Sequence, residues 1–487
     1  MTAAPRRFFQ ITFALAGIAC VLAILGAWYR GPWLDDFATF RFANPSVPLA
    51  VAWHKFWPSE TNPPLFYLIA REGVALHAHS LFARRCVNLL PLAVLLFWFV
   101  RNFRRYPQQR LFLALFWLIA TTSSYFFWDF SSYRSYFYQY AAAVIFLGGL
   151  ALDELEQRRE TDWAQIAMVP LLINLHQVTA LYAGALLLVL LIRDARRGLW
   201  NRFTAYLVTA EISVVPLLMF TWNQISRGDS AFEHVAWILP HGTWAALRLI
   251  MGFLPRALGQ NWIALLAGLA ALIWARPRGP QAKLLGLLAA AAVLGTGLLL
   301  AANLATPLIV DRYFALLTAT CACALAALIR PLAERWRTVA PLILAFAAFY
   351  LAVSFNQIRR DLRWNSGAAI VARLVAQCPT TRVHAGSLPP DPAEQTGMVY
   401  LAAVWHLTLL PIVPDHPDAC PVLYWTEYQP PSRVDLAQHH GDLVRAANDR
   451  AGFGLSSRQL AHTKAIKSQN GVILVVSPVD IKLPDVR

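Results

Sequence analysis

Residues 8–36 read FFQITFALAGIACVLAILGAWYRGPWLDD, and this stretch decides the fold class. No charged residue occurs from Phe8 to Trp28, and about 20 apolar residues form a helix long enough to cross the hydrocarbon core of a bilayer. Arg6 and Arg7 precede the run, as in a secretory signal peptide, but the run is too long for a signal core and no small-residue cleavage site follows it. We therefore predict a retained first transmembrane helix.

The amino-acid composition extends this interpretation to the whole chain. Of the 487 residues, 57% are hydrophobic and 14% are charged, with 18 Trp and 28 Phe, and a soluble protein cannot bury that much apolar surface. The net charge of +15 would suggest a nucleic-acid partner in a soluble protein. Most of this charge lies in short loops before residue 359, as membrane topology requires, so we expect no nucleic-acid partner.

Further apolar runs of near-span length follow along the chain, and they are uncharged except for Glu211 in the seventh. With the first they number eleven: 8–28, 86–100, 111–128, 136–152, 163–175, 178–192, 203–222, 262–274, 284–302, 313–329 and 339–355. The fifth and sixth runs are kept separate because merging them would break the alternation of Arg-rich loops further along. The sequence therefore predicts an α-helical polytopic membrane protein with about eleven transmembrane helices.

Alternate loops between these runs are rich in arginine. The basic residues of these loops are Arg6, Arg7, Arg101, Arg104, Arg105, Arg110, Arg158, Arg159, Arg193, Arg196, Arg197, Arg202, Arg276, Arg278, Lys283, Arg330, Arg335 and Arg337. By the positive-inside rule these loops face the cytoplasm. The N-terminus is then cytoplasmic, and the outer loop 29–85 and the tail 356–487 lie outside.

The outer loop 29–85 is too polar to span the membrane and too aromatic to be a linker. Residues 50–57 mix Trp, Phe, His and Lys, which is typical of a helix in the membrane interface. Earlier in the loop, Asp35 and Asp36 follow the first span closely, at headgroup depth. Two interpretations of this acidic pair are open. The acids stabilise a helix N-terminus, or they are a general base and its supporting acid.

Two other outer segments carry arginine close to tyrosine. Arg134 precedes Tyr136 at the start of the fourth run, Arg312 precedes Tyr313 at the start of the tenth, and Arg85 lies just before the second. Each is compatible with an ordinary interfacial anchor. Together with the acidic pair, however, they put fixed cations on one membrane face. Arginine stays ionised and binds phosphate oxygens bidentately, so this face suits a lipid phosphate or pyrophosphate.

The tail 356–487 predicts a small α/β domain outside the membrane, after a transmembrane domain over 1–355. It alternates a helical segment with short apolar stretches, separated by Pro-rich breaks. Cys378 and Cys420 lie in it, and an oxidising compartment would allow a disulfide between them; whether they form one stays open. The Cys and His spacings of the chain match no zinc site.

Several of these segments resemble the landmarks of one enzyme family. Trp33-Leu-Asp35-Asp36 after the first span, Asn62-Pro-Pro-Leu-Phe-Tyr67 and Arg85 resemble the Asp-Glu, His-Pro-Pro-Leu and Arg landmarks of membrane GT-C glycosyltransferases. The branch is the one that holds protein O-mannosyltransferases and the lipid A aminoarabinose transferase. Arg134 with Tyr136, His176, and Arg312-Tyr313 resemble later landmarks of that branch. The resemblance covers about 8–355, and many members carry a tail outside the membrane. Together with the Arg-rich loops, the resemblance implies a bacterial inner membrane, in which the outer loop and the tail are periplasmic.

The resemblance implies an inverting hexosyl- or pentosyltransferase that takes a sugar from a polyprenyl phosphate. Asp35 would be the base that deprotonates the acceptor hydroxyl. Asp36 stands where the family usually has Glu, and it would reach the acceptor or orient Asp35. The residues implied to bind the donor phosphate are Arg312, Arg134, Tyr313 and Arg85. Those implied to bind substrate are Asn62, at the usual His position, and His176, for which a plain helix-end role is also open.

The resemblance implies the partners but not their identity. The acceptor would be a glycolipid, a polysaccharide or a protein, and membrane lipid surrounds the chain. No cofactor is required, and a divalent metal is compatible with this chemistry. The alternative is a transporter or flippase of a lipid-linked sugar, whose main support is Glu211 near the middle of the seventh run. Glu211 fits a protonated, hydrogen-bonded packing residue equally well.

Overall fold

The computed structural model describes residues 3–60, 62–75, 80–226, 243–257, 262–274, 277–305, 309–310, 313–335, 339–386, 392–427 and 443–477. The chain divides into two compact units. The helical unit comprises Met1–Trp28 and Pro45–Ile358, and the second unit, called the tail unit below, comprises Tyr29–Asn44 and Arg359–Arg487. The segment that carries the acidic pair thus belongs to the same unit as the tail.

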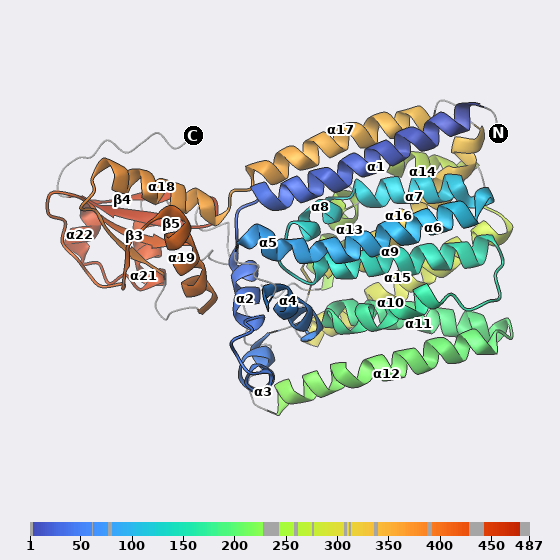
Figure 1. Cartoon of the computed structure of the whole chain (residues 1–487), viewed down its shortest axis with the longest axis horizontal. Coiled ribbons are helices and arrows are strands. Elements are labelled where there is room, and N and C mark those ends of the chain that lie inside the picture. Colours follow the sequence, from blue (N-terminus) through green and yellow to red (C-terminus); the bar gives the residue numbers. More distant parts are fainter. Residues whose placement is uncertain are drawn as a thin grey trace. The chain divides into compact units, whose positions relative to one another are not determined.

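The helical unit consists of long apolar helices and a set of short ones in the outer loop (Figure 1). The helices outside the outer loop are α1 (Ala3–Tyr29), α6 (Leu89–Arg105), α7 (Arg110–Thr121), α8 (Ser124–Phe130), α9 (Tyr136–Leu155), α10 (Trp163–Asn174), α11 (Gln177–Arg196), α12 (Trp200–Ile225), α13 (Thr243–Ala257), α14 (Trp262–Trp274), α15 (Gly279–Ala305), α16 (Ala315–Arg335) and α17 (Val339–Arg360). The loop contains α3 (Leu49–Val51), a π-helical turn (Ala52–Phe56), a 3-10 turn (Trp57–Ser59), α4 (Leu65–Ala75) and α5 (Leu81–Arg85).

The predicted class, a polytopic α-helical membrane protein, is confirmed, but the count of eleven spans is not. Within the described residues, seven helices are long and apolar enough to cross a membrane. The third predicted run, 111–128, is two helices, because hydroxyl groups divide it. Thr122 and Ser123 bond back to the carbonyls of Leu118 and Ala120, and the Ser123 hydroxyl accepts the N–H of Phe126 to start α8. The fifth and sixth runs are separate helices, α10 and α11, as predicted.

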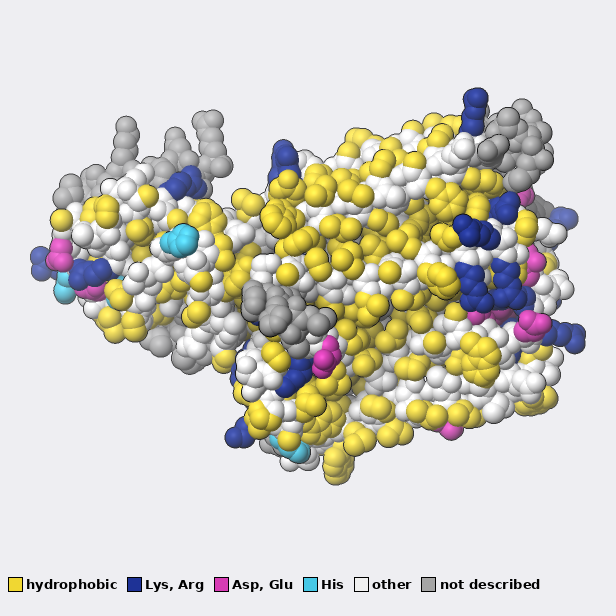
Figure 2. All heavy atoms as spheres, in the orientation of Figure 1, with side chains coloured by type: hydrophobic (Ala, Val, Ile, Leu, Met, Phe, Trp, Pro, Cys, Tyr) yellow, Lys and Arg dark blue, Asp and Glu magenta, His cyan; other side chains and the backbone are white. Residues whose placement is uncertain are grey.

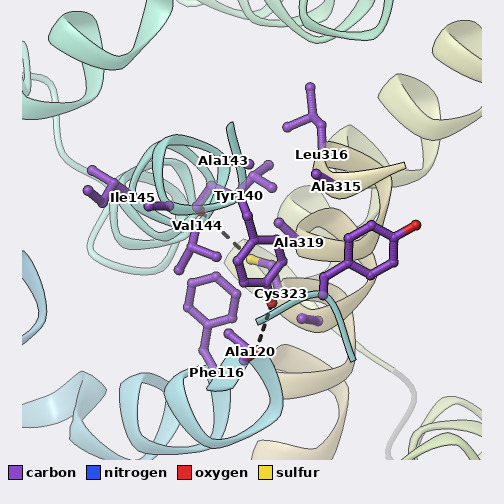
Figure 3. Close-up of a cluster of buried hydrophobic side chains, with 14 of the residues drawn as sticks. Phe116, Ala120, Tyr140, Ala143, Val144, Ile145, Ala315, Leu316, Ala319 and Cys323 are labelled. Carbon is purple, nitrogen blue, oxygen red and sulfur yellow. Dashed lines mark hydrogen bonds between the residues drawn. The ribbon is translucent and has the colours of Figure 1, made fainter. Parts of the chain in front are cut away.

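Helix α9 forms the centre of the helical unit, and every residue from Tyr136 to Glu154 is buried. Figure 3 shows its side chains between those of α7 and α16: the Tyr140 hydroxyl donates to the carbonyl of Ala120 at 2.8 Å, and the Cys323 thiol lies 3.7 Å from the carbonyl of Leu147. The face of the unit seen in Figure 2 is largely hydrophobic, and on it Lys and Arg side chains gather at the end where the N-terminus lies. That distribution agrees with the Arg-rich loops of the predicted cytoplasmic side.

Several of those loop arginines are buried in ion pairs. Arg202 contacts Asp153 at 2.7 Å and Asp194 at 3.4 Å, and Arg193 contacts Glu154 at 3.1 Å. These pairs join α9, α11 and α12 at one end of the helical unit. Because both members of each pair are buried, removal of one member would leave an uncompensated charge.

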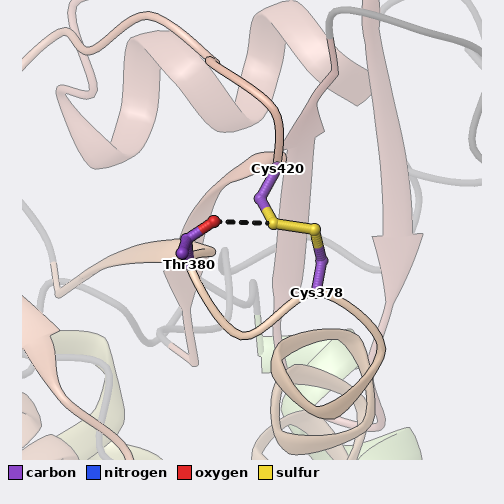
Figure 4. Close-up of a disulfide and its surroundings, with 3 residues drawn as sticks. All are labelled: Cys378, Thr380 and Cys420. Atoms are coloured by element: carbon purple, nitrogen blue, oxygen red, sulfur yellow. Dashed lines mark hydrogen bonds between the residues drawn. A yellow bond between two sulfur atoms is a disulfide. The ribbon is translucent and has the colours of Figure 1, made fainter.

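The tail unit contains a five-stranded sheet with the order β2-β1-β3-β5-β4. Its elements are α2 (Leu34–Phe42), α18 (Trp364–Gln377), β1 (Arg382–Ala385), α19 (Pro392–Trp405), β2 (Leu409–Leu410), β3 (Val422–Thr426), α21 (Leu443–Ala451), α22 (Ser457–Ala461), β4 (Thr463–Lys467) and β5 (Val472–Val476). β2, β1 and β3 are parallel to one another. β5 pairs antiparallel with β3, and β4 pairs antiparallel with β5. The predicted α/β architecture of the tail is confirmed. Cys378 and Cys420 form the disulfide that the sequence left open, with Cα atoms 5.7 Å apart (Figure 4).

Candidate active site

The acidic pair opens helix α2 in the tail unit. Trp33 is the N-cap residue, and a carboxylate oxygen of Asp36 accepts the Trp33 backbone N–H at 3.3 Å. Asp36 therefore caps the helix. Asp35 lies one residue earlier in the first turn, and its own backbone carbonyl accepts the Thr39 hydroxyl at 3.0 Å. Both carboxylates are buried, so the two interpretations of the pair divide between its members: Asp36 stabilises the helix start, and Asp35 is the candidate base.

A buried ion pair joins loop 29–85 to the segment just before α9. Nη1 of Arg134 lies 3.0 Å from Oε2 of Glu60 and 2.8 Å from the hydroxyl of Tyr67, and all three residues are buried. Asn62 donates its side-chain N–H to Oε1 of Glu60 at 3.1 Å. Glu60 thus holds the amide of Asn62 and the guanidinium of Arg134 with its two carboxylate oxygens. Burial raises the pKa of the Tyr67 phenol well above its usual value, so Tyr67 stays neutral beside this pair.

Three aromatic rings lie at the ends of helices in the same unit. His176 is the N-cap of α11, and its Nδ1 accepts the N–H of Val178 at 3.2 Å. The neutral imidazole therefore carries its proton on Nε2. The His176 and Tyr313 rings have centroids 4.2 Å apart, and Tyr136 lies 6.2 Å from His176 and 6.5 Å from Tyr313. His176 thus has the helix-end role that the sequence left open, and its Nε2 points away from the N-cap hydrogen bond.

Amide side chains connect the ion pair with the turn at His176. The Gln224 amide donates to the backbone carbonyl of Glu60 at 2.7 Å, and its oxygen accepts from Gln177 at 2.9 Å. Thr179 donates its hydroxyl to Gln139 at 2.8 Å, one turn into α9. These groups are neutral, so this network adds no charge beside the Arg134–Glu60 ion pair.

The predicted site residues that the structure describes therefore fall into four places. Asn62 and Arg134 meet at Glu60, and His176 and Tyr313 contact each other, all in the helical unit; Asp35 and Asp36 lie in the tail unit. Arg85 is buried elsewhere in the helical unit, where its Nη1 donates to the carbonyl of Ala27 at the end of α1 at 3.0 Å. Arg312 lies outside the described residues.

Glu60 is the functional candidate that the sequence analysis missed. Loop 29–85 contains only four acidic residues, and Glu60 is two residues before the Asn62-Pro-Pro segment. That position was an available signal. Its partner was not visible, because Arg134 is 74 residues further along the chain. Among the described residues, no group of three or more His, Cys, Asp or Glu side chains is arranged to hold a metal ion.

No family model and no curated protein matches the sequence. Among solved structures, the crystal structure of ArnT from Cupriavidus metallidurans bound to undecaprenyl phosphate aligns with a TM-score of 0.53 over 96% of this chain and 98% of that chain. The chain has the ArnT fold. The sequences share 14% identity, and the apo structure of the same ArnT aligns with the same TM-score, 13% identity and 95% and 97% coverage. At this identity the similarity shows the fold, and at that level the predicted resemblance is confirmed.

Proposed function

We propose that the protein is an inverting glycosyltransferase that moves a sugar from a polyprenyl phosphate to an acceptor outside the cytoplasm. The observation that carries the proposal is the buried Arg134 with Glu60 and Tyr67, within a chain whose fold is that of a protein crystallised with undecaprenyl phosphate. A membrane protein keeps an arginine buried and ionised only where paired groups or a ligand compensate its charge.

On the donor side, Arg134 binds the lipid phosphate. Negative charge develops on this leaving group as the bond to the sugar breaks, and a fixed guanidinium in a dry site stabilises that charge. The neutral Tyr67 hydroxyl adds a hydrogen bond without adding an anion. His176 and Tyr313 supply aromatic surface for the sugar. Arg312 is retained as a second phosphate ligand on the strength of the sequence resemblance.

On the acceptor side, Asp35 is the general base. The acceptor oxygen attacks the anomeric carbon from the face opposite the phosphate, so the new C–O bond forms as the C–O bond to phosphate breaks. The proton of the acceptor hydroxyl passes to the Asp35 carboxylate, and the phosphate leaves as an anion. Asp36 holds the start of α2 through the Trp33 N–H and so orients its neighbour. This chemistry requires no metal ion.

The transporter alternative loses its main support. Glu211 lies on the exposed face of α12 together with Val208, Ile212 and Val215, and not among the buried residues of that helix. A transport path would need polar groups between the helices. Glu211 therefore does not line a route through the helical unit.

The test is donor cleavage by purified protein. Detergent-solubilised protein is incubated with a panel of polyprenyl-phosphate sugars and with envelope lipid, polysaccharide or peptide acceptors, and released polyprenyl phosphate is measured by mass spectrometry. Acceptor-dependent release from one donor, with inverted configuration at the transferred sugar, is the expected result. A protein that moves donors across liposome membranes without cleaving any of them would refute the proposal.

A further inference from the structure

Backbone hydrogen bonds join the segment just before the acidic pair to the first residues after α17. The Gly31 N–H donates to the carbonyl of Asp361 at 2.9 Å, and the Trp364 N–H donates to the carbonyl of Pro32 at 3.3 Å. Arg30 adds an ion pair, with its Nε 3.2 Å from the Asp361 carboxylate. The two segments, residues 30–32 and 361–364, are more than 300 residues apart in sequence, and these bonds join them within one unit.

The two segments pack so closely that only glycine fits at position 31. A Cβ on Gly31 would lie 1.8 Å from the carbonyl oxygen of Leu362. Next to this contact, Arg363 has φ +46°, a left-handed conformation that costs a non-glycine residue free energy. Its guanidinium lies 4.4 Å from the Trp33 ring centroid and 2.6 Å from Asp361. Strain of this kind persists where surrounding contacts fix the backbone.

Helix α2 is then anchored by Phe37. The Phe37 side chain is 0% exposed, and its ring centroid lies 5.1 Å from that of Trp364 and 5.6 Å from that of Tyr400. Gly397 of α19 allows this packing, because a Cβ there would lie 2.3 Å from the Trp364 ring and 2.6 Å from the Phe37 ring. The position of α2 is thus determined by α18 and α19 of the tail.

The anchor and the candidate base are two residues apart on the same short helix. At about 100° per residue, Asp35 and Phe37 point to roughly opposite sides of α2. When Phe37 is fixed in the core of the tail unit, the direction of the Asp35 carboxylate is fixed as well. A shift of α2 by a fraction of a helical turn would move the carboxylate by an ångström or more.

We propose that the tail unit positions the candidate base. Packing among Phe37, Trp364 and Gly397 holds the Asp35 carboxylate in the orientation in which it accepts the proton of the acceptor. The proposal rests on the proposed function, in which Asp35 is the base. Phe37, Trp364 and Gly397 are positioning residues, since they act through Asp35 and not on the substrate. The tail unit then governs acceptor activation, and the affinity for the lipid phosphate is independent of it.

The test is a steric substitution with a suppressor. Gly397→Ala inserts one methyl group between the Phe37 and Trp364 rings, and Phe37→Leu removes ring atoms to make room for it. The matched control is Val399→Leu, which adds one carbon on the same helix at a side chain that is 70% exposed. Turnover is measured in the donor-cleavage assay, and the Kd for undecaprenyl phosphate is measured in parallel. Asp35→Asn provides the reference for complete loss of the base.

We expect Gly397→Ala to lower kcat about tenfold or more, since ångström misplacement of a catalytic group is costly, with Kd for undecaprenyl phosphate within about twofold of wild type. Phe37→Leu in the same chain should restore turnover several-fold, and Val399→Leu should match wild type. Wild-type turnover in Gly397→Ala overturns the proposal. Parallel loss of turnover and of lipid binding, without recovery in the double variant, also overturns it. Unaltered turnover in Asp35→Asn would instead refute the base assignment.

Discussion

Replacing Glu60 with glutamine tests how the donor phosphate is bound. The substitution keeps the shape of the side chain and removes one negative charge beside Arg134. In the structure Nη1 of Arg134 lies 3.0 Å from the Glu60 carboxylate, and both side chains are buried. If the same guanidinium binds the lipid phosphate, the carboxylate and the phosphate share one cation and repel each other.

The size of this repulsion follows from the geometry. A phosphate oxygen hydrogen-bonded to another edge of the guanidinium would lie roughly 6 Å from the Glu60 carboxylate. Two unit charges at that distance repel by about 3 kcal/mol at an effective dielectric constant of 20. About 1.4 kcal/mol corresponds to a tenfold change in Kd. Loss of the carboxylate that orients Arg134 offsets part of the gain, so we expect Glu60→Gln to bind undecaprenyl phosphate about tenfold more tightly.

The assay is direct titration of undecaprenyl phosphate into detergent-purified protein. Glu72→Gln is the matched control, because Glu72 is an exposed glutamate on α4 of the same loop and its substitution should leave Kd unchanged. Arg134→Ala should abolish measurable binding. Weaker binding in Glu60→Gln than in wild type would refute the repulsion, and unchanged binding in Arg134→Ala would remove Arg134 from the phosphate site.

Three further predictions concern the tail unit. Cys378→Ser should destabilise the tail by up to about 4 kcal/mol, the chain-entropy estimate for a disulfide between residues 42 apart, seen as a lower melting temperature that reductant no longer shifts. Burial raises the pKa of the Glu427 carboxyl well above its usual value, so the wild-type fold loses stability as pH rises from the unfolded pKa toward the folded one. Glu427→Gln should therefore raise the melting temperature at pH 8 and not at pH 4, and an equal shift at both would contradict this. Asp36→Asn keeps an acceptor for the Trp33 N–H and should retain most turnover, whereas Asp36→Ala should lose about 1 kcal/mol of helix stability and most of the activity; equal activities would refute the capping role.

The helices were predictable because hydropathy is a local property. Each predicted run contains described helix, and the alternation of Arg-rich loops separated α10 from α11 correctly. The break between α7 and α8 was missed because it is caused by hydrogen bonds from the hydroxyl groups of Thr122 and Ser123 to backbone carbonyls. Thr and Ser barely lower the mean hydropathy of a run, so hydropathy does not reveal the break.

The site was predictable by residue type but not by contact. Arg134 and the acidic pair were singled out because charged groups at a membrane face are few, and Asn62 was singled out because its segment resembles a family landmark. The pairing of Arg134 with Glu60 and the binding of the acidic segment to the tail join residues 74 and more than 300 positions apart. Such contacts depend on the folded arrangement of many helices, and one sequence carries no signal for their distance.

The most direct test of the account is the turnover of Asp35→Asn. Asparagine keeps the size of the side chain and cannot take a proton from the acceptor. We predict that acceptor-dependent release of polyprenyl phosphate falls by about 10² to 10⁴-fold, the usual contribution of a general base, while undecaprenyl phosphate binds with the wild-type Kd. Release at close to the wild-type rate would contradict the assignment of Asp35 and, with it, the proposed mechanism.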